Sequence, residues 1–357
     1  MADFHKVKLA DIYKETDDTS VLTFDIPQEL KENFKFHQGQ HLTLRQVIDG
    51  EDIRRSYSLC SSPLEDKWQV AVKQIPGGKF STYVNEQLKS NELLEIMAPS
   101  GTFGVEVLPQ ASKNYLFFAA GSGITPIMSM IKTHLAAEPN STCKLFYVNK
   151  TAKSIIFKEE LEQLRNTYFG RLEIYYFLTK EKRDIDLFNG RFDDDKMKVL
   201  TNTFIDIPDT SEVFLCGPET MVNYVSDFLI KAGLPKELIH FELFVSGLSE
   251  EDIKRQERLA KQNVEGVEVT IVDGGKEFLF TMTKDYDNIL DAALNAGADL
   301  PFACKGGVCS TCKCQVVDGE VEMKINYALE DKEVAQNYVL SCQAVPTTPK
   351  IVVDFDV

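Results

Sequence analysis

A short cysteine-rich stretch near the end of the sequence, PFACKGGVCSTCKC at residues 301–314, constrains this chain more than any other feature. It places four of the eight cysteines within eleven residues. Grouped thiols can form disulfides, bind zinc, carry out thiol–disulfide exchange or hold an iron–sulfur cluster, and each use predicts a different class of protein. The compartment and the cysteine spacing narrow the choice.

The compartment is indicated by the first residues and by hydropathy. MADFHKVKLADIYKETDD, at residues 1–18, lacks the basic and then apolar pattern of a secretory signal peptide. No apolar run in the sequence is long enough to span a bilayer. We therefore expect a cytoplasmic protein without membrane segments, in which grouped cysteines more often hold metal than form disulfides.

The spacing of the thiols is more specific. Four of them follow the pattern C-x4-C-x2-C with a distant fourth member: Cys304, Cys309, Cys312 and Cys342. This is the plant-type [2Fe–2S] spacing, whereas structural zinc sites typically use paired C-x2-C units. Four of the residues between the first three are small, so the backbone can wrap closely and direct N–H groups at the sulfurs: Gly306, Gly307, Ser310 and Thr311. The sequence therefore predicts a [2Fe–2S] cluster with these four ligands, and Cys314 is expected to be a packed core thiol.

Charge excludes one class of partner. The 357-residue chain carries a formal net charge of −16, which argues against nucleic-acid binding because phosphate affinity needs clustered Lys and Arg. Residues 265–357 contain 16 Asp or Glu, 7 Lys and no Arg, a net charge of −9. This acidic region is either an ordinary solvated surface or a module that docks a more basic partner protein.

Three regions of different pattern follow one another along the chain. Residues 1–108 contain short alternating strands separated by Gly and Pro, which favours an antiparallel β-barrel with one short helix. In residues 109–245 buried strands alternate with helical stretches, which is typical of an α/β domain with a parallel sheet. A polar, charged segment at 246–265 is interpreted as a linker that is partly helical. Residues 266–357 begin with two strands joined by Gly-Gly, a hairpin signal, and form a third module.

Two motifs in the first region suit a flavin dinucleotide. In RSYS, Arg55 can pair with phosphate, Tyr57 can lie against the ring system and Ser58 can reach a ring nitrogen. GGKFS at residues 77–81 opens the short helix, whose first N–H groups can bind the second phosphate. Each motif alone also fits an ordinary strand or turn. The candidate flavin-binding residues are Arg55, Ser56, Tyr57, Ser58, Lys73, Gly78, Lys79, Ser81 and Thr82.

The second region carries two loops that suit a nicotinamide dinucleotide. GSGITP follows its first strand, where glycines let a pyrophosphate approach a helix N-terminus. CGP ends its last clear strand, and ligands bind at such carboxyl ends of parallel sheets. Cys216 is either a buried small hydrophobe or a residue lining the nicotinamide pocket. The candidate residues of the two loops are Gly121, Gly123, Thr125, Pro126, Cys216, Gly217 and Pro218.

The coenzyme is expected to be NADPH, with NADH as the alternative. An adenosine 2′-phosphate needs positive charge and hydroxyls near the ends of the middle strands. Lys150 and Ser154 follow the second strand of the α/β region, and Arg183 follows the third. Lys and Arg are also common in ordinary surface loops, which is the alternative interpretation of these residues.

These motifs together resemble the ferredoxin–NADP reductase superfamily, and residues 266–357 resemble a plant-type ferredoxin domain. The resemblance implies a flavin barrel, a nicotinamide α/β domain and a ferredoxin domain with the α+β β-grasp fold. It also places FELF, residues 241–244, over the flavin face, so that Glu242 and Phe244 become candidate site residues. We expect Ser58 and Glu242 to tune flavin N5 and Cys216 to act in the same catalytic site. FAD is preferred over FMN.

The domain order resembles the reductase components of multicomponent oxygenases, and the motifs are similar to those of the phenylacetyl-CoA epoxidase reductases. This implies an NAD(P)H-dependent oxidoreductase that passes electrons through FAD and the [2Fe–2S] cluster to an oxygenase component, in the degradation of phenylacetate. The alternatives are the reductase of another di-iron or Rieske oxygenase, a stand-alone quinone or ferric reductase, and a zinc-stabilised or redox-sensing interaction protein without turnover.

Overall fold

The computed structural model describes residues 3–244, 250–262 and 266–356, and divides into two compact units. Residues 6–53 and 57–244 form one unit, and the described residues within 1–5, 54–56 and 245–357 form the other. Among the described residues, no helix combines the length and the apolar character needed to cross a membrane. Each unit is described by itself below.

The first sheet has the strand order β4-β3-β6-β1-β2-β5, and its paired strands β1/β2, β2/β5 and β3/β6 are antiparallel. A bridge between Leu59 and Val70 joins the end of the edge strand β4 to the opposite edge strand β5. This contact closes the sheet, which confirms the predicted barrel. The elements are β1 His5–Thr16, β2 Thr19–Asp25, β3 His41–Ile48, β4 Glu51–Ser58, β5 Trp68–Lys73, α1 Lys79–Glu86 and β6 Leu93–Ile96.

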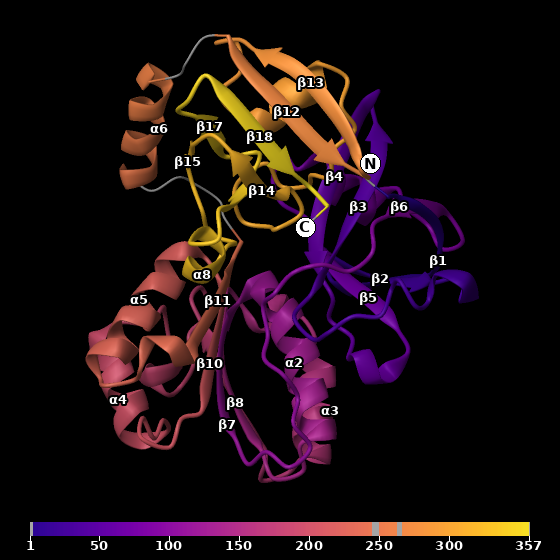
Figure 1. Cartoon of the computed structure of the whole chain (residues 1–357). Coiled ribbons are helices and arrows are strands. Elements are labelled where there is room, and N and C mark those ends of the chain that lie inside the picture. The colour runs from indigo at the N-terminus through magenta and orange to yellow at the C-terminus, as the bar shows by residue number, and fades with distance from the viewer. Residues whose placement is uncertain (1–2, 245–249, 263–265, 357) are drawn as a thin grey trace. The chain divides into compact units, whose positions relative to one another are not determined.

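The second sheet is parallel, with the order β11-β10-β7-β8-β9. Helices α2 and α3 cover one face, and α4 and α5 lie on the other (Figure 1). Strands covered on both faces are apolar along almost their whole length. The sequence of β7, NYLFFAA, has this property. The elements are β7 Asn114–Ala120, α2 Ile124–Ala137, β8 Thr142–Asn149, α3 Lys158–Thr167, β9 Leu172–Leu178, α4 Asp194–Thr203, β10 Glu212–Gly217, α5 Glu219–Lys231 and β11 Ile239–Leu243.

The third sheet has the order β13-β12-β18-β14-β16, with a separate pair β15-β17. Its opening hairpin turns at Gly274 and Gly275, whose φ angles of 59° and 68° are those that a two-residue type I′ turn requires. The hairpin is followed by the short helix α7, and Asn288 caps it by accepting a hydrogen bond from Asp291 N–H. The elements are β12 Val267–Asp273, β13 Lys276–Met282, α7 Ile289–Asn295, β14 Lys313–Asp318, β15 Val321–Met323, α8 Asp331–Val334, β16 Tyr338–Leu340, β17 Ala344–Pro346 and β18 Lys350–Asp354.

The segment interpreted as a linker contains the 13-residue helix α6, Glu250–Gln262. Its flanks at 246–249 and 263–265 lie outside the described residues. The boundaries 1–108, 109–245, 246–265 and 266–357 stay predictions. Short 3-10 turns complete the chain: η1 Gln28–Leu30, η2 Pro63–Glu65, η3 Gly121–Gly123, η4 Ala152–Ser154, η5 Asp186–Phe188 and η6 Lys236–Leu238.

Candidate functional site

The four cysteines of the predicted cluster lie together as two pairs, and none of the four forms a disulfide among the described residues. The Cys309 sulfur lies 3.1 Å from that of Cys304. Cys312 and Cys342 form a second hydrogen-bonded pair. The turn that places the first three ligands runs between α7 and β14, and the fourth ligand follows β16. The fold therefore brings Cys342 back across about 30 residues of intervening chain to complete the set.

The paired arrangement suits two metal ions better than one. A tetrahedral zinc site would need four donors around one point, whereas a [2Fe–2S] cluster spreads four cysteines over two irons. The thiols present thus fit the cluster.

Backbone N–H groups are directed at the sulfurs, as the small residues of the loop suggested. Gly306 N–H donates to the Cys304 sulfur at 3.3 Å. Gly307, which has a φ of +74°, donates to the sulfur of Cys342. The hydrogen bond from Cys312, together with those from Gln343 and Gly307, lowers the pKa of Cys342 against the opposing effect of burial. Such donors stabilise negative charge on the sulfurs.

Cys314 differs from its four neighbours in sequence. Its side chain is fully buried in the hydrophobic core of the module, and burial raises its pKa well above the ordinary value. Cys314 is therefore placed as a core thiol.

The flavin motif RSYS occupies the last half of β4. Ser58 is buried, and its hydroxyl donates to the Glu242 carboxylate on β11 at 3.0 Å. Tyr57 lies beside Phe80 of α1, with ring centroids 5.8 Å apart. Arg55 is exposed and donates to the Arg54 carbonyl at 2.7 Å. Ser58 and Glu242, expected to act on the same flavin atom, are thus brought together from positions 184 residues apart.

The turn before α1 is built by Ser81 rather than left open for a ligand. Gly78 is the N-cap of the helix. The Ser81 hydroxyl accepts a hydrogen bond from Ile75 N–H and donates to the Gly78 carbonyl, both at 3.2 Å. Thr82 is half-buried and accepts a hydrogen bond from Gln74. Ser81 therefore shapes the turn, and a phosphate there would depend on backbone N–H groups and on Thr82.

Both lysines of the predicted flavin set are engaged in ion pairs. Lys73 lies 3.4 Å from Asp18, and Lys79 lies 2.6 Å from Glu51. Ser56 lies on the same strand as Arg55 and is half-buried. Neither lysine is presented as a bare cation, so binding of a phosphate by either one would compete with its carboxylate.

The first nicotinamide loop packs directly on the end of strand β10. A side chain at Gly123 would lie 2.2 Å from the Cys216 carbonyl oxygen, so only glycine fits this approach. Gly121 has a φ of +54°. Thr125 is buried and donates to the Ser122 carbonyl at 3.0 Å, and Pro126 lies in the first turn of α2. The loop thus presents its helix start at the carboxyl edge of the sheet, where dinucleotides bind.

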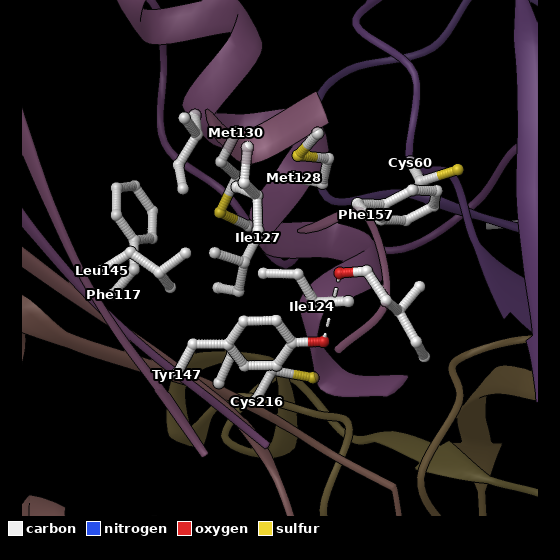
Figure 2. Close-up of a cluster of buried hydrophobic side chains, with 14 of the residues drawn as sticks. Cys60, Phe117, Ile124, Ile127, Met128, Met130, Leu145, Tyr147, Phe157 and Cys216 are labelled. Carbon is white, nitrogen blue, oxygen red and sulfur yellow. Dashed lines mark hydrogen bonds between the residues drawn. The ribbon is translucent and has the colours of Figure 1, made fainter. Parts of the chain in front are cut away.

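Tyr147, which the sequence did not single out, supports this loop from β8. Its hydroxyl donates to the Gly121 carbonyl at 2.9 Å and lies 3.5 Å from the Ile156 carbonyl. Figure 2 shows Tyr147 beside Cys216, with Ile124 of α2 close by. The residue lies inside an apolar strand, so no local pattern could have revealed its role.

The second nicotinamide loop continues from β10. Cys216 is fully buried, and burial, reinforced by Glu242, raises its pKa well above the ordinary value. Gly217 has a φ of +154°, and its carbonyl accepts a hydrogen bond from Phe244 N–H at 3.4 Å. Pro218 is exposed and caps α5. Cys216 thus belongs to the hydrophobic core beside the loops, as a protonated thiol.

A pocket of about 460 Å³ lies at the carboxyl ends of β8 and β9. Arg183 lines it together with Lys182 and Lys158, whereas Lys150 is exposed outside the set of lining residues. Ser154 is also outside that set, and its hydroxyl is used in a capping interaction with Thr151. The structure therefore brings one of the three predicted 2′-phosphate residues to this pocket.

Two acidic residues share the pocket with these cations. Glu181 accepts a hydrogen bond from Ala152 N–H at 2.8 Å, and Asp184 also lines the wall. The five ionisable lining groups other than tyrosine are Lys158, Lys182, Arg183, Glu181 and Asp184, a net charge of +1. The sequence prediction did not include the two carboxylates, which come to the wall from the same loop as Lys182 and Arg183.

Comparison with known proteins gives the class. Three family models match in order: an oxidoreductase FAD-binding domain at residues 6–104, an oxidoreductase NAD-binding domain at 117–227 and a 2Fe-2S iron-sulfur cluster binding domain at 271–347. The chain therefore belongs to the ferredoxin–NADP reductase superfamily, among its members with a C-terminal [2Fe–2S] ferredoxin domain. It is an oxidoreductase with sites for FAD, a nicotinamide dinucleotide and a [2Fe–2S] cluster, which confirms the predicted resemblance.

Full-length relatives are more specific. The chain is 42% identical over 356 residues to a component of the 1,2-phenylacetyl-CoA epoxidase of Escherichia coli K12, covering 100% of this chain and 99% of that protein. It is 31% identical to the ferredoxin reductase component of 3-ketosteroid-9-alpha-monooxygenase from Rhodococcus rhodochrous, covering 96% and 95%. The structure of phthalate dioxygenase reductase matches with a TM-score of 0.60 and 22% identity, covering 99% and 98%, and so shares the fold.

Proposed function

We propose that this protein is the reductase component that supplies electrons from NADPH to a phenylacetyl-CoA epoxidase, and that it works in the cytoplasm. The observation that carries the proposal is the 42% identity along the whole chain to the Escherichia coli epoxidase component. The paired thiols of the cluster loop support the last step, because they suit the exit of single electrons. Its domain boundaries would be those predicted above, with 246–265 as the linker.

The C-terminal cysteines would hold the electron-exporting group. Cys304 and Cys309 would ligate one iron and Cys312 and Cys342 the other, in accordance with the two pairs. The net charge of −9 on residues 265–357 favours an oxygenase surface that is basic where it meets this module.

The barrel and the sheet ends would hold the two nucleotides. Tyr57 would lie against the flavin ring, and Arg55 and the start of α1 would bind its phosphates. The Ser58–Glu242 pair would then fix a hydroxyl and a carboxylate where a hydride reaches the flavin. Phe244, half-buried beside the nicotinamide core, would cover the ring from the end of β11. Bound FAD supplies the conversion from two-electron to one-electron chemistry.

The coenzyme proposal rests on the pocket at β8 and β9. Arg183 donates to the Tyr176 carbonyl at 2.9 Å and lies over the Phe188 ring, so its guanidinium is held at the wall. A planar guanidinium in a fixed position is well suited to a phosphate. With Lys158 and Lys182 nearby, it supports NADPH over NADH.

A reconstituted assay tests the pathway. The purified protein, loaded with FAD and iron, is mixed with the oxygenase component of a phenylacetyl-CoA epoxidase, and product is measured with NADPH. We expect epoxide formation that depends on both proteins. Cytochrome c reduction without any epoxide formation would contradict the pathway while leaving the reductase activity in place.

A second candidate, the reductase of a different oxygenase, is favoured by the 31% identity to the 3-ketosteroid-9-alpha-monooxygenase reductase component. Pairing this protein with that oxygenase in the same assay separates the two. Faster turnover with the steroid oxygenase than with the epoxidase would replace the first proposal.

The Arg183→Ala variant tests the coenzyme. Loss of the guanidinium should lower kcat/KM for NADPH by about tenfold, while the value for NADH stays near that of the wild type. Arg165→Ala is the matched control, because Arg165 pairs with Glu162 on α3 and does not line the pocket. An equal loss with both coenzymes would assign Arg183 a structural role, and a large wild-type preference for NADH would overturn the coenzyme proposal.

A further inference from the structure

Gln343 follows the last cluster cysteine and is almost completely buried, with 4% of its surface exposed. Its backbone is fixed on both sides: its N–H donates to the Leu340 carbonyl at 2.8 Å, and its carbonyl accepts from Lys324 N–H at 2.9 Å. The side chain is therefore presented to the cysteine loop from a rigid position.

The amide nitrogen of Gln343 makes two contacts in that loop. It donates to the Lys305 carbonyl at 3.0 Å and to the Cys342 sulfur at 3.5 Å. An amide oxygen in the same place would face the Lys305 carbonyl with no hydrogen between them. The carbonyl thus fixes the orientation of the amide, and this leaves the second amide hydrogen for the sulfur.

The loop is shaped around this side chain. Lys305 adopts a φ of +51°, a left-handed conformation that is uncommon for a residue with a side chain. A side chain at Gly307 would lie 3.2 Å from Cγ of Gln343. Gln343 therefore holds the strained turn after Cys304 and at the same time reaches the sulfur of Cys342. Its side chain thus connects the two cysteine pairs, since Cys304 belongs to the first and Cys342 to the second.

We propose that Gln343 is a positioning residue that raises the reduction potential of the cluster by donating a hydrogen bond to the Cys342 sulfur. This inference rests on the proposed ligation of the cluster by the four cysteines. Reduction adds negative charge that is shared by the sulfurs, and an N–H donor stabilises the more negative form. Gly306 and Gly307 donate from the backbone, so a change of side chain leaves their N–H groups in place. The donor of Gln343 belongs to its side chain and is removed by substitution.

The test is a redox titration of the iron-loaded, full-length protein and of its Gln343→Leu and Gln343→Met variants. The electron paramagnetic resonance signal of the reduced cluster measures the fraction reduced at each potential. Both substitutions keep the bulk of the side chain and remove the donor. We expect a lower potential, corresponding to a roughly three- to tenfold smaller equilibrium constant for one-electron reduction, at most about 59 mV. Gln315→Leu is the matched control, because that amide donates to the Gln336 carbonyl rather than to a sulfur.

An unchanged potential in variants with full iron content would overturn the inference while leaving the cluster proposal intact. A wild-type protein that binds zinc and no iron would overturn both. If the variants lose iron, pulsed electron paramagnetic resonance of the wild type with ¹⁵N in the glutamine side chains decides. A ¹⁵N coupling to the reduced cluster that persists in Gln315→Leu supports the hydrogen bond, and the absence of any coupling refutes it.

Discussion

The cysteine loop of the C-terminal module and the buried core of the nicotinamide region both contain sulfur, but they surround it with different atoms. In the loop, N–H groups of Gly306 and Gln343 point at the sulfurs. In the core, Cys216 lies among the apolar side chains around Tyr147 and Ile124 (Figure 2). Sulfur atoms of the loop thus have N–H donors beside them, whereas the sulfur of Cys216 lies in an apolar core.

The pKa shifts of the loop thiols differ among themselves: the pKa of Cys342 is lowered, whereas those of Cys304 and Cys312 are raised, as in the core. Burial raises the pKa of Cys216 and of Cys143, because an apolar core penalises the thiolate. Cys342 is also buried, yet its hydrogen-bond donors outweigh this effect and lower its pKa. Burial alone therefore does not fix the direction of the pKa shift at Cys342, where the hydrogen bond from Cys312 is the largest cause.

The largest expected effect comes from removing a loop thiol. Cys342→Ala should abolish the iron–sulfur absorption and reduce electron transfer to cytochrome c to near the background, because one iron loses a ligand. Flavin reduction by NADPH in stopped flow should persist.

The matched control is Cys314→Ala, which removes a thiol from the core of the same module. It should keep the full iron content and lose only about 1 kcal/mol of stability. Equal loss of iron in both variants would show that the cluster depends on the packing of the module and not on the particular thiol.

The nicotinamide core should respond more strongly to loss of a carboxylate than to loss of a thiol. Glu138 is fully buried and accepts hydrogen bonds from Tyr115 OH at 2.9 Å and from Leu108 N–H at 3.0 Å; its carboxylate also lies 3.2 Å from Nδ1 of His134. Glu138→Ala should cost about 3 kcal/mol of unfolding free energy in urea denaturation, because buried donors are left without a partner.

The pH dependence of this contribution has a definite sign. Burial alone would raise the pKa of Glu138, but the Leu108 N–H, His134, Ser141 and Tyr115 together hold it below its ordinary value. The stabilisation is therefore fully present above the ordinary carboxyl pKa and is lost as the pH falls through the lowered one. Glu138→Gln should show a flatter loss of stability in acid than the wild type; identical acid profiles would contradict the assignment.

A smaller effect separates the two interpretations of Cys216. Cys216→Ala and Cys143→Ala each remove one fully buried thiol from the same sheet, so each should cost about 1 kcal/mol. If Cys216 also lines the nicotinamide site, only Cys216→Ala should slow flavin reduction by NADPH, by about tenfold. Equal rates in the two variants would leave Cys216 as a core residue.

Local motifs were the part of the site that the sequence could predict. Three of the four cluster cysteines, Gly121 and the start of α1 lie in short segments whose spacing reflects their geometry directly. The strand and turn pattern also predicted the hairpin that β12 and β13 form, since alternation and a Gly-Gly turn are local properties.

Contacts across the fold were not predictable in the same way. The Ser58–Glu242 pair joins residues 184 apart, and it was expected only from the family resemblance. Tyr147 lies inside the apolar strand β8, and Gln343 lies between the short strands β16 and β17. Both act through side-chain hydrogen bonds in segments whose composition reflects burial and not function. The ion pairs of Lys73 and Lys79 likewise depend on which carboxylates the barrel brings near them.

The smallest expected effect is that the buried core thiols do not react with an alkylating reagent. This outcome tests directly whether those thiols are inert. Burial raises the pKa of Cys60 to about 12, and the shifts of Cys143, Cys216 and Cys314 have the same direction. These four thiols should therefore resist iodoacetamide at pH 8 in the native holoprotein and react fully in guanidinium chloride, as read by mass spectrometry of peptides. Rapid labelling of Cys216 in the native protein, with Cys143 untouched, would show that the end of β10 opens to solvent and would move Cys216 from the core to the site.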